Sequence, residues 1–133
     1  MYIISACLLG EDCKYNGANN ASEAVKRLAE KHTYIAVCPE VTGGFTTPRP
    51  PVELVGGRAL RPDGEDVTEG FITGAEATWR EIQEKAAACG EPIELAILKQ
   101  RSPSCGAGKI YDGTFSGKLI PGDGILTAYL KEK

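Results

Sequence analysis

The sequence predicts a small α/β domain of the Rossmann-like type, in which helices cover both faces of a short parallel sheet in three layers. Short apolar runs alternate with longer stretches whose apolar residues recur every three or four positions, a pattern typical of βαβ units. The length of 133 residues suits one hydrophobic core. The hydrophobic fraction of 42% and the charged fraction of 25% are ordinary for a globular protein. We therefore expect a single domain spanning residues 1–133.

Three short apolar runs are the expected strands of this sheet. They cover residues 2–6, 34–37 and 93–98. Each run is too short for a stable helix and contains β-branched or aromatic residues, which favour strands. Because helical crossovers make such strands parallel, their carboxyl ends should lie along one edge of the sheet.

Two short helices are expected, one after the first strand and one near residue 130. Asn20 or Ser22 can cap the first helix, which should reach about Lys31. The second should begin at Asp123 or Gly124 and carry several apolar side chains on one face.

The longest expected helix lies between the second and third strands. Thr68 can cap its first turn, and Gly90 can end it. Its apolar residues recur at helical spacing and should pack on the sheet; they are Phe71, Ile72, Ala75, Trp79, Ile82 and Ala86.

Two long segments lie outside these elements. Residues 39–64 are rich in glycine and proline, which favours an excursion with a small hairpin between residues 52–55 and 58–61. Residues 99–117 are expected to be a loop. Long loops in compact domains are usually functional or disordered, so the functional residues should be sought there.

The charge of the chain restricts its partners. A net charge of −3 and a pI of about 5.2 give no basic field of the kind that binds bulk nucleic acid. No apolar run approaches the roughly 20 residues that span a bilayer, and residues 1–10 lack the basic start of a signal peptide. We therefore expect a cytoplasmic protein that binds a small molecule; the sequence indicates no oligomeric state.

Three of the five cysteines follow the predicted strands. Cys7 follows the first strand, Cys38 follows the second, and Cys105 lies in the loop after the third. Since these positions share one edge of a parallel sheet, the three thiols should meet in the ligand crevice. Reducing conditions in the cytoplasm argue against structural disulfides.

The remaining candidates for a metal or nucleophile site fall elsewhere. Cys89 and His32 both precede a predicted strand, so both should lie at the opposite edge, with Cys89 packed as a small hydrophobe and His32 at the surface. No CxxC pair indicates structural zinc. Three thiolates in glycine-rich loops suit an iron–sulfur cluster better, and three ligands would leave one iron open. Cys13 could alternatively supply a fourth ligand.

A set of motifs resembles a known family. In order along the chain they are SACLLG (5–10), CKYNG (13–17), CPEVTGGFTTPRPP (38–51), KQRSPSCG (99–106) and IYDGTFSG (110–117). Together they resemble the thiouracil desulfidase (TudS-like) family, formerly catalogued as a domain of unknown function. The resemblance covers almost the whole chain.

The resemblance implies an enzyme with a [4Fe-4S] cluster on the three cysteines that correspond to Cys7, Cys38 and Cys105. It implies hydrolytic removal of sulfur from thiolated pyrimidines, either thiouracil or 4-thiouridine monophosphate, without net redox change. The alternative is a closed iron–sulfur binding or sensing module in which Cys13 is the fourth ligand. A domain whose cysteines merely pack is a third interpretation, although no GxGxxG or Walker loop follows the first strand.

The proposed chemistry needs a proton acceptor and a group that orients water. Glu40, two residues after Cys38, is the expected general base. Ser102 and Ser104 flank Pro103 beside Cys105, and either hydroxyl could orient water or relay a proton. Four cations are candidates for contact with a substrate phosphate, namely Lys14, Arg49, Lys99 and Arg101.

Overall fold

A three-stranded parallel sheet forms the centre of the structure. The computed structural model describes residues 1–133. The strands are β1 (Tyr2–Ser5), β2 (Tyr34–Val37) and β5 (Leu95–Ile97), in the order β2-β1-β5. All three predicted strands are present and parallel; β2 has the predicted bounds, and the other two are shorter than predicted. The α/β class with a short parallel sheet is therefore confirmed.

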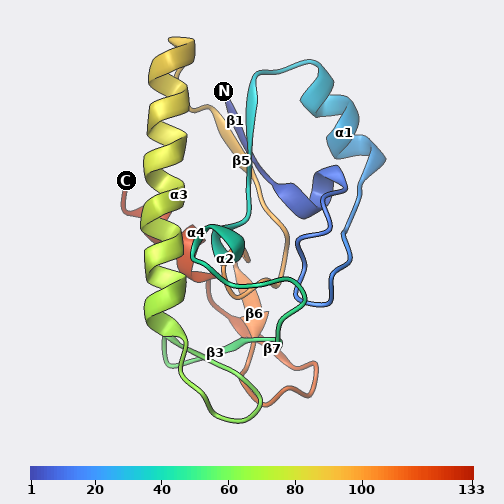
Figure 1. Ribbon diagram of the computed structural model, residues 1–133, viewed down its shortest axis with the longest axis vertical. Coiled ribbons are helices and arrows are strands. Elements are labelled where there is room, and N and C mark those ends of the chain that lie inside the picture. The colour runs from blue at the N-terminus through green and yellow to red at the C-terminus, as the bar shows by residue number, and fades with distance from the viewer.

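Three helices surround the sheet (Figure 1). They are α1 (Glu23–Glu30), α3 (Thr68–Cys89) and α4 (Ile125–Lys131). In Figure 1, α1 and α3 lie on opposite sides of the strands. α3 contacts β2 and α4, whereas α1 packs on the short 3₁₀ turn Ala6–Leu9 that follows β1. No helix combines the length and the apolar character needed to cross a membrane.

The helix ends agree with the sequence in two cases and differ in one. Ser22 caps α1, because its hydroxyl accepts a hydrogen bond from the amide of Val25 at 3.3 Å. Gly90 ends α3 in the left-handed conformation with φ 68°. The prediction that Thr68 caps α3 was wrong: Thr68 is already helical, and its hydroxyl accepts instead from the amide of Ala59 at 2.8 Å.

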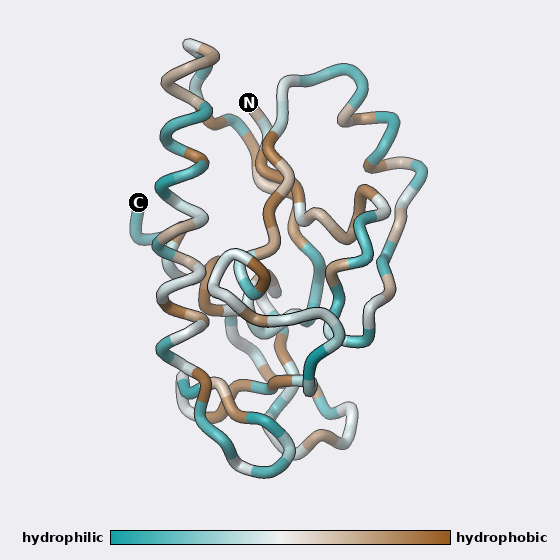
Figure 2. Tube along the Cα trace, in the orientation of Figure 1, coloured by the Kyte–Doolittle hydropathy of each residue, from teal (hydrophilic) through white to brown (hydrophobic).

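The hydrophobic residues gather in two buried clusters. Figure 2 shows hydrophobic colour along the central strands, while much of α1 is hydrophilic. The larger cluster joins the sheet to α3 and α4 through Met1, Ile3, Val37, Ala75, Ile82, Cys105 and Leu126. The smaller one comprises Val52, Leu54, Ala59, Phe71 and Ile110. Ile72, predicted to lie on the apolar face of α3, is 42% exposed, because it lies on the side of the helix turned away from both clusters.

The segments expected to be loops contain more regular structure than predicted. The hairpin β3 (Glu53–Val55) and β4 (Arg58–Leu60) was expected. A second hairpin pairs β6 (Lys109–Tyr111) with β7 (Leu119–Pro121), and a short helix α2 (Pro39–Thr42) follows β2. The interpretation of residues 99–117 as a loop was therefore wrong in part. β6 and β7 have three residues each, too few to show a period, and no two-residue glycine turn marks their connection as Gly56-Gly57 marks that of β3 and β4.

Candidate functional site

The carboxyl ends of β1, β2 and β5 open into a cavity of about 600 Å³. Four of the five thiols line it, those of Cys7, Cys13, Cys38 and Cys105. The structure thus brings together the three cysteines that the sequence placed at this edge. It adds Cys13 to the same wall.

Cys7 is held by the turn that follows β1. Its carbonyl accepts hydrogen bonds from the amides of Gly10 at 3.2 Å and Asn20 at 2.9 Å. The side-chain amide of Asn20 also donates to the Cys7 sulfur at 3.7 Å. These contacts fix a thiol that is only 8% exposed, with a hydrogen-bond donor already directed at its sulfur.

Cys38 is the residue immediately before α2, and close packing between helices fixes α2. Pro39 begins the helix, where its missing N–H costs nothing. A Cβ on Gly74 of α3 would collide with the carbonyl of Pro39. A Cβ on Gly43 would lie 2.6 Å from a carbonyl of α3. The glycines therefore let the two helices approach, and this approach positions both Cys38 and Glu40.

Cys105 lies in a turn fastened to the start of α4. The amide of Ile125 donates to the Pro103 carbonyl at 2.9 Å, and the Thr127 hydroxyl donates to the Cys105 carbonyl at 2.8 Å. Cys105 is 5% exposed and belongs to the larger core cluster. The RSPSCGAG stretch is thus a rigid support that holds a thiol at the floor of the cavity.

The four thiols differ in their affinity for a proton. The neighbouring Cys13 thiol lowers the pKa of Cys7 to about 6 and that of Cys38 to about 7. The same two neighbours raise the pKa of Cys13, and the Cys38 thiol lies 3.8 Å from the Cys13 carbonyl oxygen, to which it donates. Burial raises the pKa of Cys105 to about 12. Cys7 and Cys38 therefore lose a proton more readily than an ordinary cysteine does.

The donor set fits an iron–sulfur cluster better than a single metal ion. No three Cys, His, Asp or Glu side chains lie close enough to share one ion. In a cubane cluster each thiolate binds a different iron, so the thiols must surround a space. The cavity provides that space, and the side-chain amide of Asn20 donates a hydrogen bond to the Cys7 sulfur at 3.7 Å.

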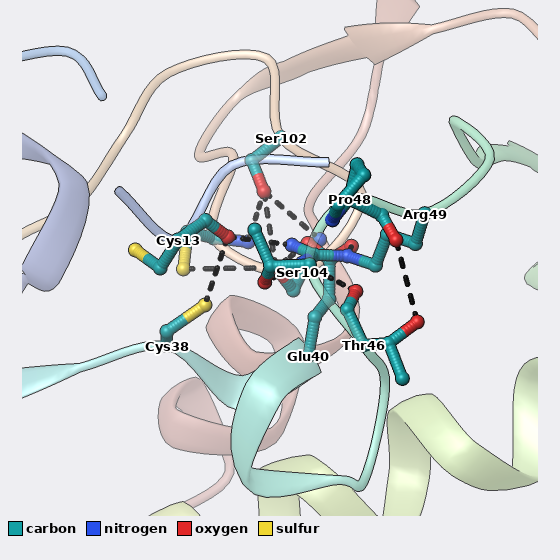
Figure 3. A network of polar contacts seen from close by, with 10 residues as sticks. Cys13, Cys38, Glu40, Thr46, Pro48, Arg49, Ser102 and Ser104 are labelled. Atoms are coloured by element: carbon teal, nitrogen blue, oxygen red, sulfur yellow. Dashed lines mark hydrogen bonds and ion pairs between the residues drawn. The ribbon is translucent and has the colours of Figure 1, made fainter. Parts of the chain in front are cut away.

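Glu40, Ser104 and Ser102 form a chain of hydrogen bonds beside these thiols (Figure 3). Ser104 Oγ donates to Glu40 Oε2 at 3.0 Å and lies 3.0 Å from Ser102 Oγ. Ser102 Oγ also accepts from the amides of Ser104 and Cys105 at 3.2 and 3.1 Å. The two serines differ in their contacts. Ser104 donates to the carboxylate, whereas Ser102 accepts from the amides of the turn.

Arg49 is part of this network and is not available to bind a phosphate, so that interpretation was wrong. Its side chain is 4% exposed, and Nε donates to Glu40 Oε1 at 3.2 Å. Nη2 donates to the Cys13 carbonyl at 2.8 Å. Nη1 donates to the Thr46 carbonyl at 3.2 Å and to Thr47 Oγ1 at 3.0 Å. Arg49 thus ties α2 to the Cys13 segment, as Figure 3 shows.

The other three candidate cations, Lys14, Lys99 and Arg101, also line the cavity. None of them forms an ion pair with a carboxylate of the chain. Burial lowers the pKa of Lys99; attraction to Cys7 opposes this effect, and repulsion from Lys14 and Arg101 adds to it. This wall therefore carries three cations that have no carboxylate partner within the chain.

Two residues lie away from the cavity, as predicted. Cys89 ends α3 and His32 precedes β2. Cys89 is exposed, so the expectation that it packs as a small hydrophobe was wrong. His32 lies at the surface and stacks on Tyr2, with ring centroids 4.2 Å apart.

Sequence reasoning missed a set of residues on the cavity wall that belong to the two hairpins and to the Cys13 segment. They include Tyr15, Glu53, Tyr111 and Phe115. The IYDGTFSG motif was the available signal, since it contains two of them. The hairpin that carries it was not predicted, so its side chains could not be placed.

The fold and this site together define an α/β protein with a thiol-lined centre suited to an iron–sulfur cluster. The chain belongs to the 2-thiouracil desulfurase family, which it matches over residues 2–133. The family resemblance and the expectation of an enzyme are thereby confirmed.

Two relatives support this membership. The uncharacterized protein YbbK of Bacillus subtilis (strain 168) is 42% identical over 142 aligned positions, which cover 99% of this chain and 90% of YbbK. A solved structure described as the [4Fe-4S]-dependent thiouracil desulfidase TudS is 41% identical, with a TM-score of 0.83. That match covers 98% of this chain and 84% of the other.

Proposed function

We propose that residues 1–133 form a single-domain [4Fe-4S]-dependent desulfidase that replaces the sulfur of a thiolated pyrimidine with oxygen from water. The observation that carries this proposal is the convergence of Cys7, Cys38 and Cys105 with the Glu40–Ser104 pair in one cavity. The likeness to a solved desulfidase at 41% identity supports it. We also assign the domain to the Rossmann-like three-layer class, because the crossovers between the parallel strands contain α1 and α3.

In this proposal Cys7, Cys38 and Cys105 hold the cluster, and Cys13 remains a thiol. Three protein ligands would leave one iron open, and such an iron would supply a Lewis acid for the thiocarbonyl sulfur. The fold supports this division of roles, because Cys7, Cys38 and Cys105 each lie after a strand of the parallel sheet, whereas Cys13 lies in the segment before α1. Asn20, which donates to the Cys7 sulfur, stabilises the thiolate form.

Glu40 acts as the general base. Water must lose a proton as its oxygen attacks the ring carbon, and the Glu40 carboxylate lies at the cavity wall beside the thiols. Arg49 holds Oε1 and Ser104 holds Oε2, so the carboxylate cannot rotate away. Ser104 Oγ orients the attacking water or passes its proton on to Glu40. In the overall reaction the thiocarbonyl and water become a carbonyl and hydrogen sulfide, with no change in oxidation state.

Three cations of the cavity wall support a substrate that carries a phosphate. Lys14, Lys99 and Arg101 line the cavity without carboxylate partners. A phosphate attached to the substrate would neutralise them. We therefore propose that a thiolated pyrimidine nucleotide such as 4-thiouridine monophosphate is used in preference to the free base. A comparison of kcat/KM for this nucleotide and for thiouracil tests that preference.

An isotope experiment tests the hydrolytic reaction. Protein loaded with cluster under anaerobic conditions is incubated with 2-thiouracil in ¹⁸O-water, with no electron donor or acceptor added. We expect uracil that carries one ¹⁸O atom, together with one sulfide for each uracil formed. An absolute requirement for a reductant, or oxygen that does not come from water, would contradict the proposal.

A further inference from the structure

The hairpin loop between β6 and β7 forms one wall of the cavity and has no role in the mechanism above. Tyr111 at the end of β6 and Phe115 in the loop both line the cavity that contains the four thiols and Glu40. Both side chains are partly buried. The aromatic wall, defined here as Tyr111 and Phe115, comes from a hairpin outside the parallel sheet.

Phe115 is held in an unusual backbone conformation. Its φ is 55°, in the left-handed region that residues other than glycine rarely adopt. Gly113 and Gly117 in the same loop also have positive φ, so this loop otherwise uses glycine where the left-handed region is needed. A phenylalanine at such a position indicates that the ring itself is required there.

Glu53 of β3 holds this conformation in place. Its Oε1 accepts hydrogen bonds from the amides of Gly113 and Phe115, both at 3.1 Å. A Cβ on Gly113 would collide with the side chain of Val55, so the loop packs closely on the β3-β4 hairpin. One carboxylate therefore fixes both ends of the three-residue segment that presents the ring.

We propose that the aromatic wall binds the pyrimidine ring by stacking, and that Glu53 is a positioning residue that holds Phe115 for this contact. This inference rests on the proposed function, because it concerns how the thiolated pyrimidine is placed in the same cavity. Aromatic side chains stack on every base through its π-face. A volume of about 600 Å³ is within the range of small-molecule sites, and the side chains of both Tyr111 and Phe115 line it.

Binding of uracil tests the stacking directly. Uracil carries the same ring without the sulfur, so its binding does not depend on an iron–sulfur bond. Isothermal titration compares the native protein with Phe115→Tyr, which keeps an aromatic ring, and Phe115→Asn, a residue that tolerates the left-handed conformation. We expect Phe115→Tyr to bind normally and Phe115→Asn to bind about tenfold more weakly, as for the loss of one stack.

The positioning role of Glu53 has a separate readout. In Glu53→Ala the amides of Gly113 and Phe115 should exchange hydrogen faster, and the KM for 2-thiouracil should rise with kcat and iron content unchanged. Tyr34→Leu is the control, because it removes an aromatic ring that does not line the cavity. It should change neither the binding of uracil nor the KM for 2-thiouracil.

The outcomes separate this inference from the proposed function. Equal uracil binding by the native protein and Phe115→Asn, with normal turnover of 2-thiouracil by both, would overturn the aromatic wall alone. An unchanged KM in Glu53→Ala despite faster amide exchange would overturn the positioning role. Absence of desulfidation by the native protein, with uracil binding still dependent on the ring at position 115, would support the aromatic wall and contradict the proposed function.

Discussion

The Glu40 carboxylate has a different partner on each oxygen. Arg49 donates to Oε1, and Ser104 donates to Oε2. With a side chain that is 13% exposed, Glu40 remains within reach of water in the cavity. This arrangement supports a fixed base, because the partners restrict rotation without covering the carboxylate.

Replacing Glu40 tests its role as the base. We expect Glu40→Gln to bind a normal amount of iron but to lose activity by a factor of about 10² to 10⁴, the usual contribution of a general base. The measurement is kcat for 2-thiouracil together with iron and sulfide per chain. A variant that keeps full kcat would show that Glu40 is not the base.

Arg49 connects this base to the Cys13 segment. We expect Arg49→Lys to lower the free energy of unfolding of the cluster-free protein by about 2 kcal/mol. Lysine cannot donate hydrogen bonds to the Glu40 carboxylate and to the carbonyls of Thr46 and Cys13 at the same time with the geometry of the guanidinium. Urea unfolding measures the difference. Arg80→Lys on the exposed face of α3 is the control. Equal losses in both variants would mean that the buried network adds nothing.

Cys13 distinguishes an open cluster from a closed one. We expect Cys13→Ala to bind about four irons per chain and to keep desulfidase activity, because Cys13 is not a ligand in this account. Iron analysis and the electron paramagnetic resonance spectrum of the reduced protein report the result. A large loss of iron in this variant would favour the closed module with four thiolates.

At the scale of the elements, the contact between α2 and α3 sets the position of the site. Glycine inside a helix is usually unfavourable relative to alanine by about 1 kcal/mol. Gly74 nevertheless lies inside α3, because a Cβ there would collide with the carbonyl of Pro39. Glycine at this position costs helix stability, but it permits the close approach of α2 and α3 that places Cys38 and Glu40.

Helix propensity alone predicts that Gly74→Ala would stabilise the protein, whereas the contact between α2 and α3 predicts that it destabilises the protein. We expect Gly74→Ala to destabilise the protein by about 1 to 3 kcal/mol, the usual cost of overpacking, and to lower iron binding because Cys38 is displaced. The matched control is Gly70→Ala in the same helix, where the atoms nearest to the added Cβ belong to the ring of Phe45 and not to the backbone of α2. A Gly74→Ala protein more stable than the native one would contradict the account of this contact.

At the scale of the whole molecule, the sequence predicted the parts that depend on local periodicity and on sheet direction. β1, β2 and β5 were recognisable as short apolar runs, and the shared direction of parallel strands sufficed to place Cys7, Cys38 and Cys105 at one edge. The family assignment followed from motifs in those same loops.

The rest depended on contacts between segments that are distant in sequence. Nothing local to Arg49 distinguishes a buried clamp from a surface cation, and its partners come from the Cys13 segment, the adjoining loop and α2. The β6-β7 hairpin has strands of only three residues. The placement of Phe115 therefore required the hydrogen bonds from its loop to Glu53.

The most direct test of the central claim is a count of iron and sulfide, with visible absorption, for the native protein and Cys105→Ser after anaerobic reconstitution. The account predicts about four irons and four sulfides per native chain, a broad band at roughly 400 nm, and loss of both in the variant. Absence of bound iron in the native protein, or equal iron in Cys105→Ser, would contradict the claim that this cavity holds a cluster on Cys7, Cys38 and Cys105.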